Sequence, residues 1–345
     1  MPMKTLVVNK DGSLEIKEIP KPEYSAKEAL VKTIACGMCG TDVKLIHRSF
    51  KGVPESSYPI MLGHEGVGEV VEIGSEVKGL KVGDKVLLTF VDSNPALFGD
   101  LGSAWGALSE YAIVQDIEAY KEGTAPSVAY AQTVLSDDLD PVDAVMLVTF
   151  REVLSAIRYF GVKPKDSVVV FGCGPVGLTF IKLLNLYGCK DIIAVDIVDE
   201  KLKDASASGA KLAFNNKNTN LAEAIRTSYP NGVQYVLDAV GLPSVANQAM
   251  SLLADRGSVL CYGVLEKEEI TIDFSKASYN WNFICQQMPE KAEEGAAHAQ
   301  ILEWIRSGQL VMKDFISDYF NFDDSVEAYK DLLDRKILKK GIIKF

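Results

Sequence analysis

Residues 168–178 read VVVFGCGPVGL, four apolar residues followed by glycines in a G-x-G-x-x-G spacing. The apolar run has the length of a buried strand, and the next segment, PVGLTFIKLLNLYG, reads as a helix that ends at a glycine. A strand, a glycine-rich turn and a helix in this order predict a dinucleotide-binding turn, because the glycines let a pyrophosphate approach the backbone at the helix N-terminus. A glycine-rich turn that binds nothing is the alternative.

The carboxylate of Asp196 refines this prediction. Asp196 ends the next apolar strand, DIIAVDI, close to the spacing of roughly 20 residues at which such turns carry an acidic partner. A carboxylate there accepts hydrogen bonds from the adenosine ribose hydroxyls and repels a 2′-phosphate. The sequence therefore favours NAD over NADP.

The rhythm of the chain changes near residue 150. From there to about residue 286, apolar strands alternate with helical patterns, which predicts a parallel sheet with helices on both faces. Before it, short β-branched runs such as ALVKTIA, GVGEVVEIG and DKVLLTF alternate with glycine-containing turns and predict a β-rich domain. We therefore predict an α/β protein with a first domain over 1–150, completed by 287–345, and a second over 151–286.

Composition excludes several classes of partner. The 345 residues carry a formal net charge of −11, which argues against nucleic acid and anionic membranes. No apolar run approaches the roughly 18 residues of a membrane span, and the first residues lack the apolar core of a signal peptide. Six cysteines in such a chain do not make a disulfide scaffold, and Cys173, Cys189, Cys261 and Cys285 lie in apolar segments. We expect buried thiols in a cytoplasmic protein.

A second cluster of chemical interest lies in the β-rich part. Residues 35–42, ACGMCGTD, hold two cysteines, but no second Cys-x-x-Cys pair follows. Further on, LGHEGVGEVVEIG places His64 beside Glu65. Cys39, His64 and Glu65 would give zinc a thiolate, an imidazole and a carboxylate, with one position left open. A structural histidine beside a carboxylate is the alternative.

Together these motifs resemble a known family. GMCGTD, GHEGVGEVVEIG, VGDKV, SEYAIV and VVVFGCGPVGL, in this order, are similar to the zinc-dependent alcohol and polyol (sorbitol-type) dehydrogenases of the medium-chain dehydrogenase/reductase superfamily. The resemblance covers nearly the whole chain. It implies a GroES-like β-rich catalytic domain, a Rossmann domain, NAD and a catalytic zinc. It also implies that the substrate is a secondary alcohol, polyol or sugar derivative. It further implies a homo-oligomer, dimer or tetramer, paired through SVLCYGV and the segment after it.

The resemblance also implies roles for individual residues. Cys39, rather than Cys36, and His64 would ligate zinc, and Glu65 would complete the set together with a water. Thr41 would pass the alcohol proton outward, and Asp42 would support the ligating histidine. Zinc would lower the alcohol pKa before hydride leaves for the nicotinamide. The expected cofactor-binding residues are Gly172, Gly174, Pro175, Val176, Gly177, Asp196, Lys201 and Val240.

Two departures from the family pattern matter. Residues 90–111 contain no cysteine, so we expect one catalytic zinc and no structural zinc. At the usual position of a third ligand stand the apolar Leu147 and Val148, with Glu152 one helical turn later. The site is therefore either Cys39, His64, Glu65 and water, or degraded. Two other functions stay open: a zinc-free reductase of an activated double bond or quinone, and a nucleotide-binding relative without catalysis.

Overall fold

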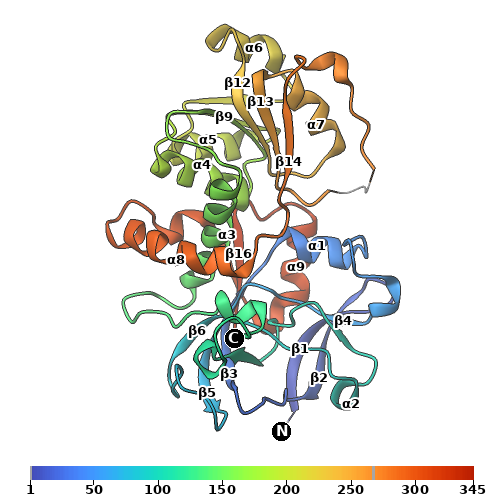
Figure 1. Ribbon diagram of the computed structural model, residues 1–345. Coiled ribbons are helices and arrows are strands. Elements are labelled where there is room, and N and C mark those ends of the chain that lie inside the picture. The colour runs from blue at the N-terminus through green and yellow to red at the C-terminus, as the bar shows by residue number, and fades with distance from the viewer. Residues whose placement is uncertain (1, 266–268) are drawn as a thin grey trace. The chain divides into compact units, whose positions relative to one another are not determined.

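The computed structural model describes residues 2–265 and 269–345 (Figure 1). The chain divides into two compact units. Unit 1 comprises Met1–Thr149, Glu290–Ala299 and Val311–Phe345, and unit 2 comprises Phe150–Pro289 and Gln300–Leu310. The sequence placed 287–345 wholly in the first domain, whereas the segment Gln300–Leu310 groups with unit 2.

Within the described part of unit 2, six parallel strands form one sheet in the order β11-β10-β9-β12-β13-β14. The strands are β9 (Ser167–Phe171), β10 (Asp191–Asp196), β11 (Leu212–Asn215), β12 (Val233–Asp238), β13 (Leu253–Cys261) and β14 (Asn282–Cys285). Counted along the chain, this is the 3-2-1-4-5-6 order of a Rossmann sheet. The predicted doubly wound parallel sheet is confirmed. The expectation of a buried thiol is wrong for Cys285, which is exposed because the apolar segment that contains it forms the edge strand β14.

Helices connect these strands on both faces of the sheet. They are α4 (Pro175–Tyr187), α5 (Asp199–Ser208), α6 (Leu221–Ser228) and α7 (Pro243–Met250). Figure 1 shows α4 and α5 together on one side of the sheet and α7 on the other. The central strand β9 is buried along its whole length, as its uninterrupted apolar sequence requires. On the face of α6 and α7, Val169 packs in one cluster with Ile225 and Ala249.

Two helix ends in unit 2 show how the sequence sets boundaries. Helix α4 ends at Gly188, whose φ of 109° is a left-handed C-cap conformation that favours glycine. The segment PSVANQAMSLLADRG, residues 243–257, reads as one helix in the sequence, but α7 ends at Met250 because Leu253 already begins the core strand β13. Tertiary pairing therefore overrides the helical pattern of the last residues in that segment.

Unit 1 is β-rich, as predicted. Its larger sheet is built around β3 (Glu28–Gly37), which pairs with three strands in antiparallel fashion. These three are β5 (Gly66–Ile73), β8 (Tyr111–Gln115) and β16 (Lys340–Lys344). Outside them lie β6 (Lys85–Thr89), beside β5, and β15 (Ile316–Asn321), beside β16. A smaller sheet contains β1 (Pro2–Val8), β2 (Leu14–Pro20), β4 (Ile60–Met61) and β7 (Gly102–Ser103).

The remaining helices include those that carry or support the site in unit 1. They are α1 (Gly40–Ile46), α2 (Pro95–Phe98), α3 (Met146–Tyr159), α8 (Lys291–Arg306) and α9 (Ser325–Leu333). Helix α1 follows the end of β3 after only two residues, and α9 precedes the last strand β16. This order brings the first and last parts of the chain into one core, where Leu45 and Tyr329 are both buried.

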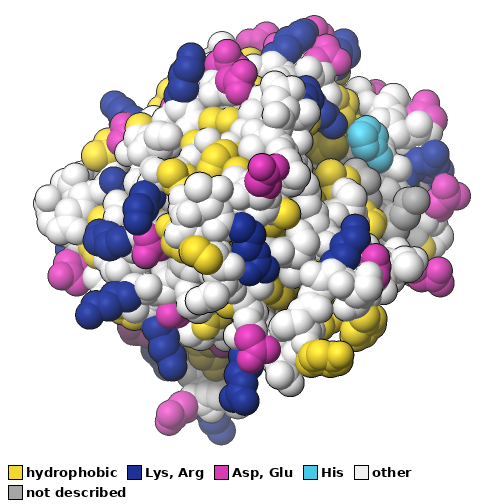
Figure 2. Space-filling view, turned by 90° about the horizontal axis from the view of Figure 1, so that it is seen from above, with side chains coloured by type: hydrophobic (Ala, Val, Ile, Leu, Met, Phe, Trp, Pro, Cys, Tyr) yellow, Lys and Arg dark blue, Asp and Glu magenta, His cyan; other side chains and the backbone are white. Residues whose placement is uncertain are grey.

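The surface carries charged side chains of both signs. On the face drawn in Figure 2, acidic and basic side chains are interspersed and do not gather into one basic patch. Over residues 2–265 and 269–345, no helix is both long and apolar enough to cross a membrane.

Candidate functional site

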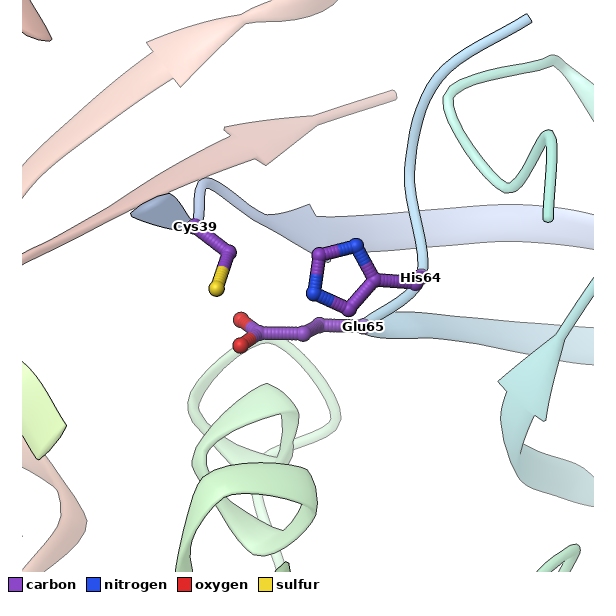
Figure 3. A group of neighbouring side chains, drawn as sticks. All are labelled: Cys39, His64 and Glu65. Carbon is purple, nitrogen blue, oxygen red and sulfur yellow. The ribbon is translucent and has the colours of Figure 1, made fainter. Parts of the chain in front are cut away.

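Cys39, His64 and Glu65 converge in unit 1. Their sulfur, nitrogen and oxygen ligand atoms all lie within 4.8 Å of one another, and Figure 3 shows the three side chains pointing toward a common centre. Strand pairing explains the convergence, because Cys36 near the end of β3 is the register partner of Gly66 at the start of β5. The segment after β3 therefore lies beside the segment before β5. In the described part of the chain, Glu152 is not a member of this cluster.

Asp42 contacts two members of the cluster, Cys39 and His64. Its buried carboxylate accepts a hydrogen bond from the Cys39 backbone N–H at 3.0 Å and another from the Tyr329 hydroxyl at 2.8 Å. The second carboxylate oxygen lies 3.5 Å from Nδ1 of His64. Burial lowers the pKa of His64, but the neighbouring Cys39 and Asp42 outweigh it and raise that pKa well above its ordinary value. The second ring nitrogen is left for the cluster.

Glu65 is held by a lysine that the sequence analysis missed. Nζ of Lys340 lies 2.6 Å from each carboxylate oxygen of Glu65, and both side chains are almost completely buried. Buried charges are stable only when they are paired and hydrogen-bonded. A signal was present in the final segment KKGIIKF, since strand periodicity puts Lys340 on the same face as the buried Ile342.

The donor set fits a zinc ion. Zinc binds thiolate sulfur, imidazole nitrogen and carboxylate oxygen, and the three ligand atoms that lie within 4.8 Å of one another here are of these types. Leu147 and Val148, at the usual position of a third ligand, are fully buried apolar residues of α3. The next residue, Thr149, donates to Glu65 at 3.4 Å. The carboxylate of Glu65 is thus the third donor available within the cluster.

Two further residues lie at or near the cluster. Thr41 is half-buried in the first turn of α1, two positions after Cys39. Trp105, which the sequence analysis did not single out, has its ring centroid 5.3 Å from that of His64. Its φ of 67° is a left-handed conformation that is rare for a bulky side chain and typical of functional sites. Phe50 contacts Trp105 edge-on, which extends an apolar wall beside His64.

The glycine turn in unit 2 has the geometry of a phosphate-binding turn. Gly172 has a φ of 89°, and the side chain of Val240 lies against it. Pro175 occupies the first turn of α4 with Val176, where its missing N–H is not needed. A Cβ on Gly177 would overlap the carbonyl oxygen of Gly172, whereas a Cβ on Gly174 would meet no atom within 4 Å. Gly177 therefore permits packing, and Gly174 leaves open space at the helix N-terminus.

Asp196 is already bonded to this turn. One of its carboxylate oxygens accepts a hydrogen bond from the Cys173 backbone N–H at 2.7 Å, and the other accepts from Ile197 and Val198. Burial and the Asp196 charge raise the pKa of Cys173 to about 12, while the Lys201 charge acts in the opposite direction. Asp196 therefore lies at the turn that holds Gly172 and Gly174.

Known protein families match segments of both units. Residues 25–123 match the family described as alcohol dehydrogenase GroES-like domain, and residues 175–283 match the family described as zinc-binding dehydrogenase. An alcohol dehydrogenase of Geobacillus stearothermophilus is 31% identical over 276 residues, covering 76% of this chain and 77% of that protein. The starvation-sensing protein RspB of Escherichia coli is 28% identical over 341 residues, covering 94% of each chain.

The fold comparison agrees. The crystal structure of 2R,3R-butanediol dehydrogenase from Bacillus subtilis superposes with a TM-score of 0.81 at 22% identity, over 99% of each chain. A GroES-like unit, a Rossmann unit and a Cys-His-Glu cluster define the class of nucleotide-linked zinc dehydrogenases. The chain belongs to the zinc-binding alcohol dehydrogenase family. It is an enzyme, an oxidoreductase that acts on CH–OH groups.

Replacement of Gly177 or Gly174, at the start of α4, by alanine should affect two different properties of the protein. Gly177→Ala places a methyl group against the Gly172 carbonyl, so we expect the free energy of unfolding to fall by about 1–3 kcal/mol. Gly174→Ala meets open space, so we expect unchanged thermal stability but NADH binding weakened by about tenfold or more, because the methyl group blocks the pyrophosphate. Denaturant titration and fluorescence titration with NADH measure the two effects. Full NADH affinity in folded Gly174→Ala would refute this assignment of the turn.

Proposed function

We propose that this enzyme oxidises a secondary alcohol group of a polyol or sugar derivative in the cytoplasm, with one zinc held by Cys39, His64, Glu65 and a water. The observation that carries the proposal is the convergence of these three side chains in a chain that also has a Rossmann turn. The six cysteines are free thiols, which supports a reducing compartment. Conversely, the same site would catalyse reduction of the matching ketone.

The residues of unit 1 would divide the work around the metal. Zinc, when bound, lowers the pKa of the alcohol. Asp42 fixes the orientation of His64, and Lys340 fixes that of Glu65. Thr41 would accept the alcohol proton and pass it outward, while Trp105 would exclude water from the apolar side of the site. In unit 2, Asp196 and Lys201 would bind the adenosine ribose, and the Gly172–Gly177 turn would bind the pyrophosphate.

The alternative functions explain less of this site. A zinc-free reductase has no use for a thiolate, an imidazole and a carboxylate that point at one centre. The only argument for a nucleotide-binding protein without catalysis is that Leu147 and Val148 are apolar. Both side chains are fully buried on α3, and Glu65 offers a metal-ligand oxygen in their place. The buried Lys340–Glu65 pair keeps that donor in place.

The proposed metal site is tested by zinc content and turnover together. We expect about one zinc per chain and NADH production over a panel of polyols, lost on chelation and restored by zinc. Glu65→Ala should lose both zinc and turnover, because only Cys39 and His64 remain. Glu152→Ala is the matched control and should keep the zinc.

Folding must be separated from metal loss in this test. Glu65→Ala removes the carboxylate that pairs with the buried Lys340 ammonium, so the double variant Glu65→Ala/Lys340→Met removes both charges of this pair together. Circular dichroism verifies that each variant is folded. A folded double variant that still holds a full equivalent of zinc would show that Glu65 is not a ligand.

Cofactor choice depends on Asp196. Its carboxylate lies at the glycine turn, where a 2′-phosphate would meet its charge. We expect the wild type to bind NADH more tightly than NADPH and Asp196→Ala to shift the balance toward NADPH by about tenfold. Calorimetric titration with both cofactors measures this ratio. Equal affinities in the wild type would rule out the proposed role of Asp196.

We also propose that the enzyme is a homodimer or tetramer. Strand β14 is the outermost strand of the sheet, and an exposed edge presents unpaired backbone groups to a second copy. Exposed apolar side chains near this edge, Phe274, Tyr279 and Met288, favour such burial. Light scattering should give two or four times the chain mass of 37.6 kDa. A single-chain mass at micromolar concentration would contradict this assembly.

A further inference from the structure

Unit 1 contains a cavity of about 450 Å³ that is separate from the candidate metal cluster. Its walls come from β1, β3, β8 and β16 and from the segments after β2 and β15, and none of Cys39, His64 and Glu65 lines it. Every lining residue belongs to unit 1, and β14, the edge proposed for assembly, takes no part in it. Sites for small molecules usually enclose about 300–1,000 Å³, so the cavity is large enough for a small ligand.

Positive charge predominates around this cavity. Its charged lining side chains are four lysines and two carboxylates: Lys4, Lys21, Lys32, Lys344, Glu110 and Asp323. Both carboxylates are already bonded to Lys4, because Asp323 accepts from its Nζ at 2.8 Å and Glu110 accepts from its backbone N–H at 2.7 Å. Among residues 2–265 and 269–345, no carboxylate side chain forms an ion pair with Lys21, Lys32 or Lys344. These three ammonium groups are therefore left for an anionic ligand.

Two of these lysines contact aromatic rings in place of carboxylates. Nζ of Lys21 lies 3.5 Å from the ring centroid of Tyr111, and Nζ of Lys344 lies 5.8 Å from that of Tyr319. A ring face attracts an ammonium group but carries no net charge. Both lysines are therefore held at the cavity with their positive charge unneutralised.

Phe345 adds an aromatic surface to the cavity. Its ring stacks on that of the buried Phe322, with the ring centroids 4.4 Å apart and the ring planes at 23°. The Phe345 backbone N–H donates to the carbonyl of Ile34 at 3.0 Å, which fixes this residue to β3. Phe345 nevertheless remains 37% exposed, so part of its ring is available to a planar group of a ligand.

We propose that this cavity binds a small phosphate monoester that carries an aromatic ring. A phosphate monoester has a charge of about −1.5 to −2 at pH 7, which three unneutralised lysines match, and lysine binds phosphate as a point charge. The ring of the ligand would stack on Phe345. The ligand would also contact β3 and β16, the strands that lead to Cys39 and carry Lys340. This site is therefore distinct from the one that binds the alcohol.

The test is calorimetric titration of the zinc-loaded full chain with phenyl phosphate, with saturating NADH present to occupy the nucleotide site. We expect one phenyl phosphate per chain. Lys21→Gln/Lys32→Gln removes two of the three unneutralised charges and should weaken binding by about tenfold or more. The matched control Lys51→Gln/Lys78→Gln makes the same change of charge at exposed positions of unit 1 outside the cavity and should bind as the wild type does.

The aromatic part of the proposal has its own variant. Phe345→Ala should reduce the affinity for phenyl phosphate to that for inorganic phosphate, which has no ring to stack. Circular dichroism verifies that each variant is folded, and none of these measurements depends on turnover. Absence of phenyl phosphate binding at millimolar concentration would overturn the proposal. Undiminished binding by folded Lys21→Gln/Lys32→Gln would do the same, and its loss on zinc removal would place the ligand at the metal.

Discussion

The buried ion pair between Lys340 and Glu65 is the interaction on which unit 1 and its candidate metal site depend. Lys340 begins the last strand, Glu65 precedes β5, and β3 lies between those two strands in the sheet. The pair meets over Gly37, where any Cβ would overlap a carboxylate oxygen of Glu65. Removing one partner of such a pair typically costs about 3–5 kcal/mol, so the end of the chain is tied to its beginning.

The same ion pair also fixes the position of the Glu65 carboxylate. The carboxylate of Glu65 is buried, and two contacts from Lys340 hold it near Cys39 and His64. Asp42 accepts a hydrogen bond from Tyr329 of α9, and its other carboxylate oxygen lies 3.5 Å from Nδ1 of His64. Both supports therefore come from the last part of the chain. The contacts of Lys340 with Glu65 and of Tyr329 with Asp42 thus span 275 and 287 residues of sequence.

Features that depend on residues close together in the sequence could be predicted, whereas features that depend on distant residues could not. The Rossmann sheet was predictable because its signal is local, an apolar strand, a glycine turn and a helix within a few residues. The sequence also singled out Cys39, His64 and Glu65 by residue type, but it could not show that they converge. Lys340 was missed because its partner is far away in sequence, and Trp105 because only its backbone conformation and its neighbour His64 mark it. Cys285 was misjudged because an apolar edge strand reads like a buried one.

The bond between Asp196 and the Cys173 backbone N–H has a consequence for how the nucleotide arrives. It ties the glycine turn to the neighbouring strand β10, so a hydrogen bond of the protein itself holds the turn in shape. The entropy of ordering the turn is then lost during folding and need not be lost again on association. We therefore expect the nucleotide to bind to a turn that is already ordered. Its association rate should depend little on loop closure.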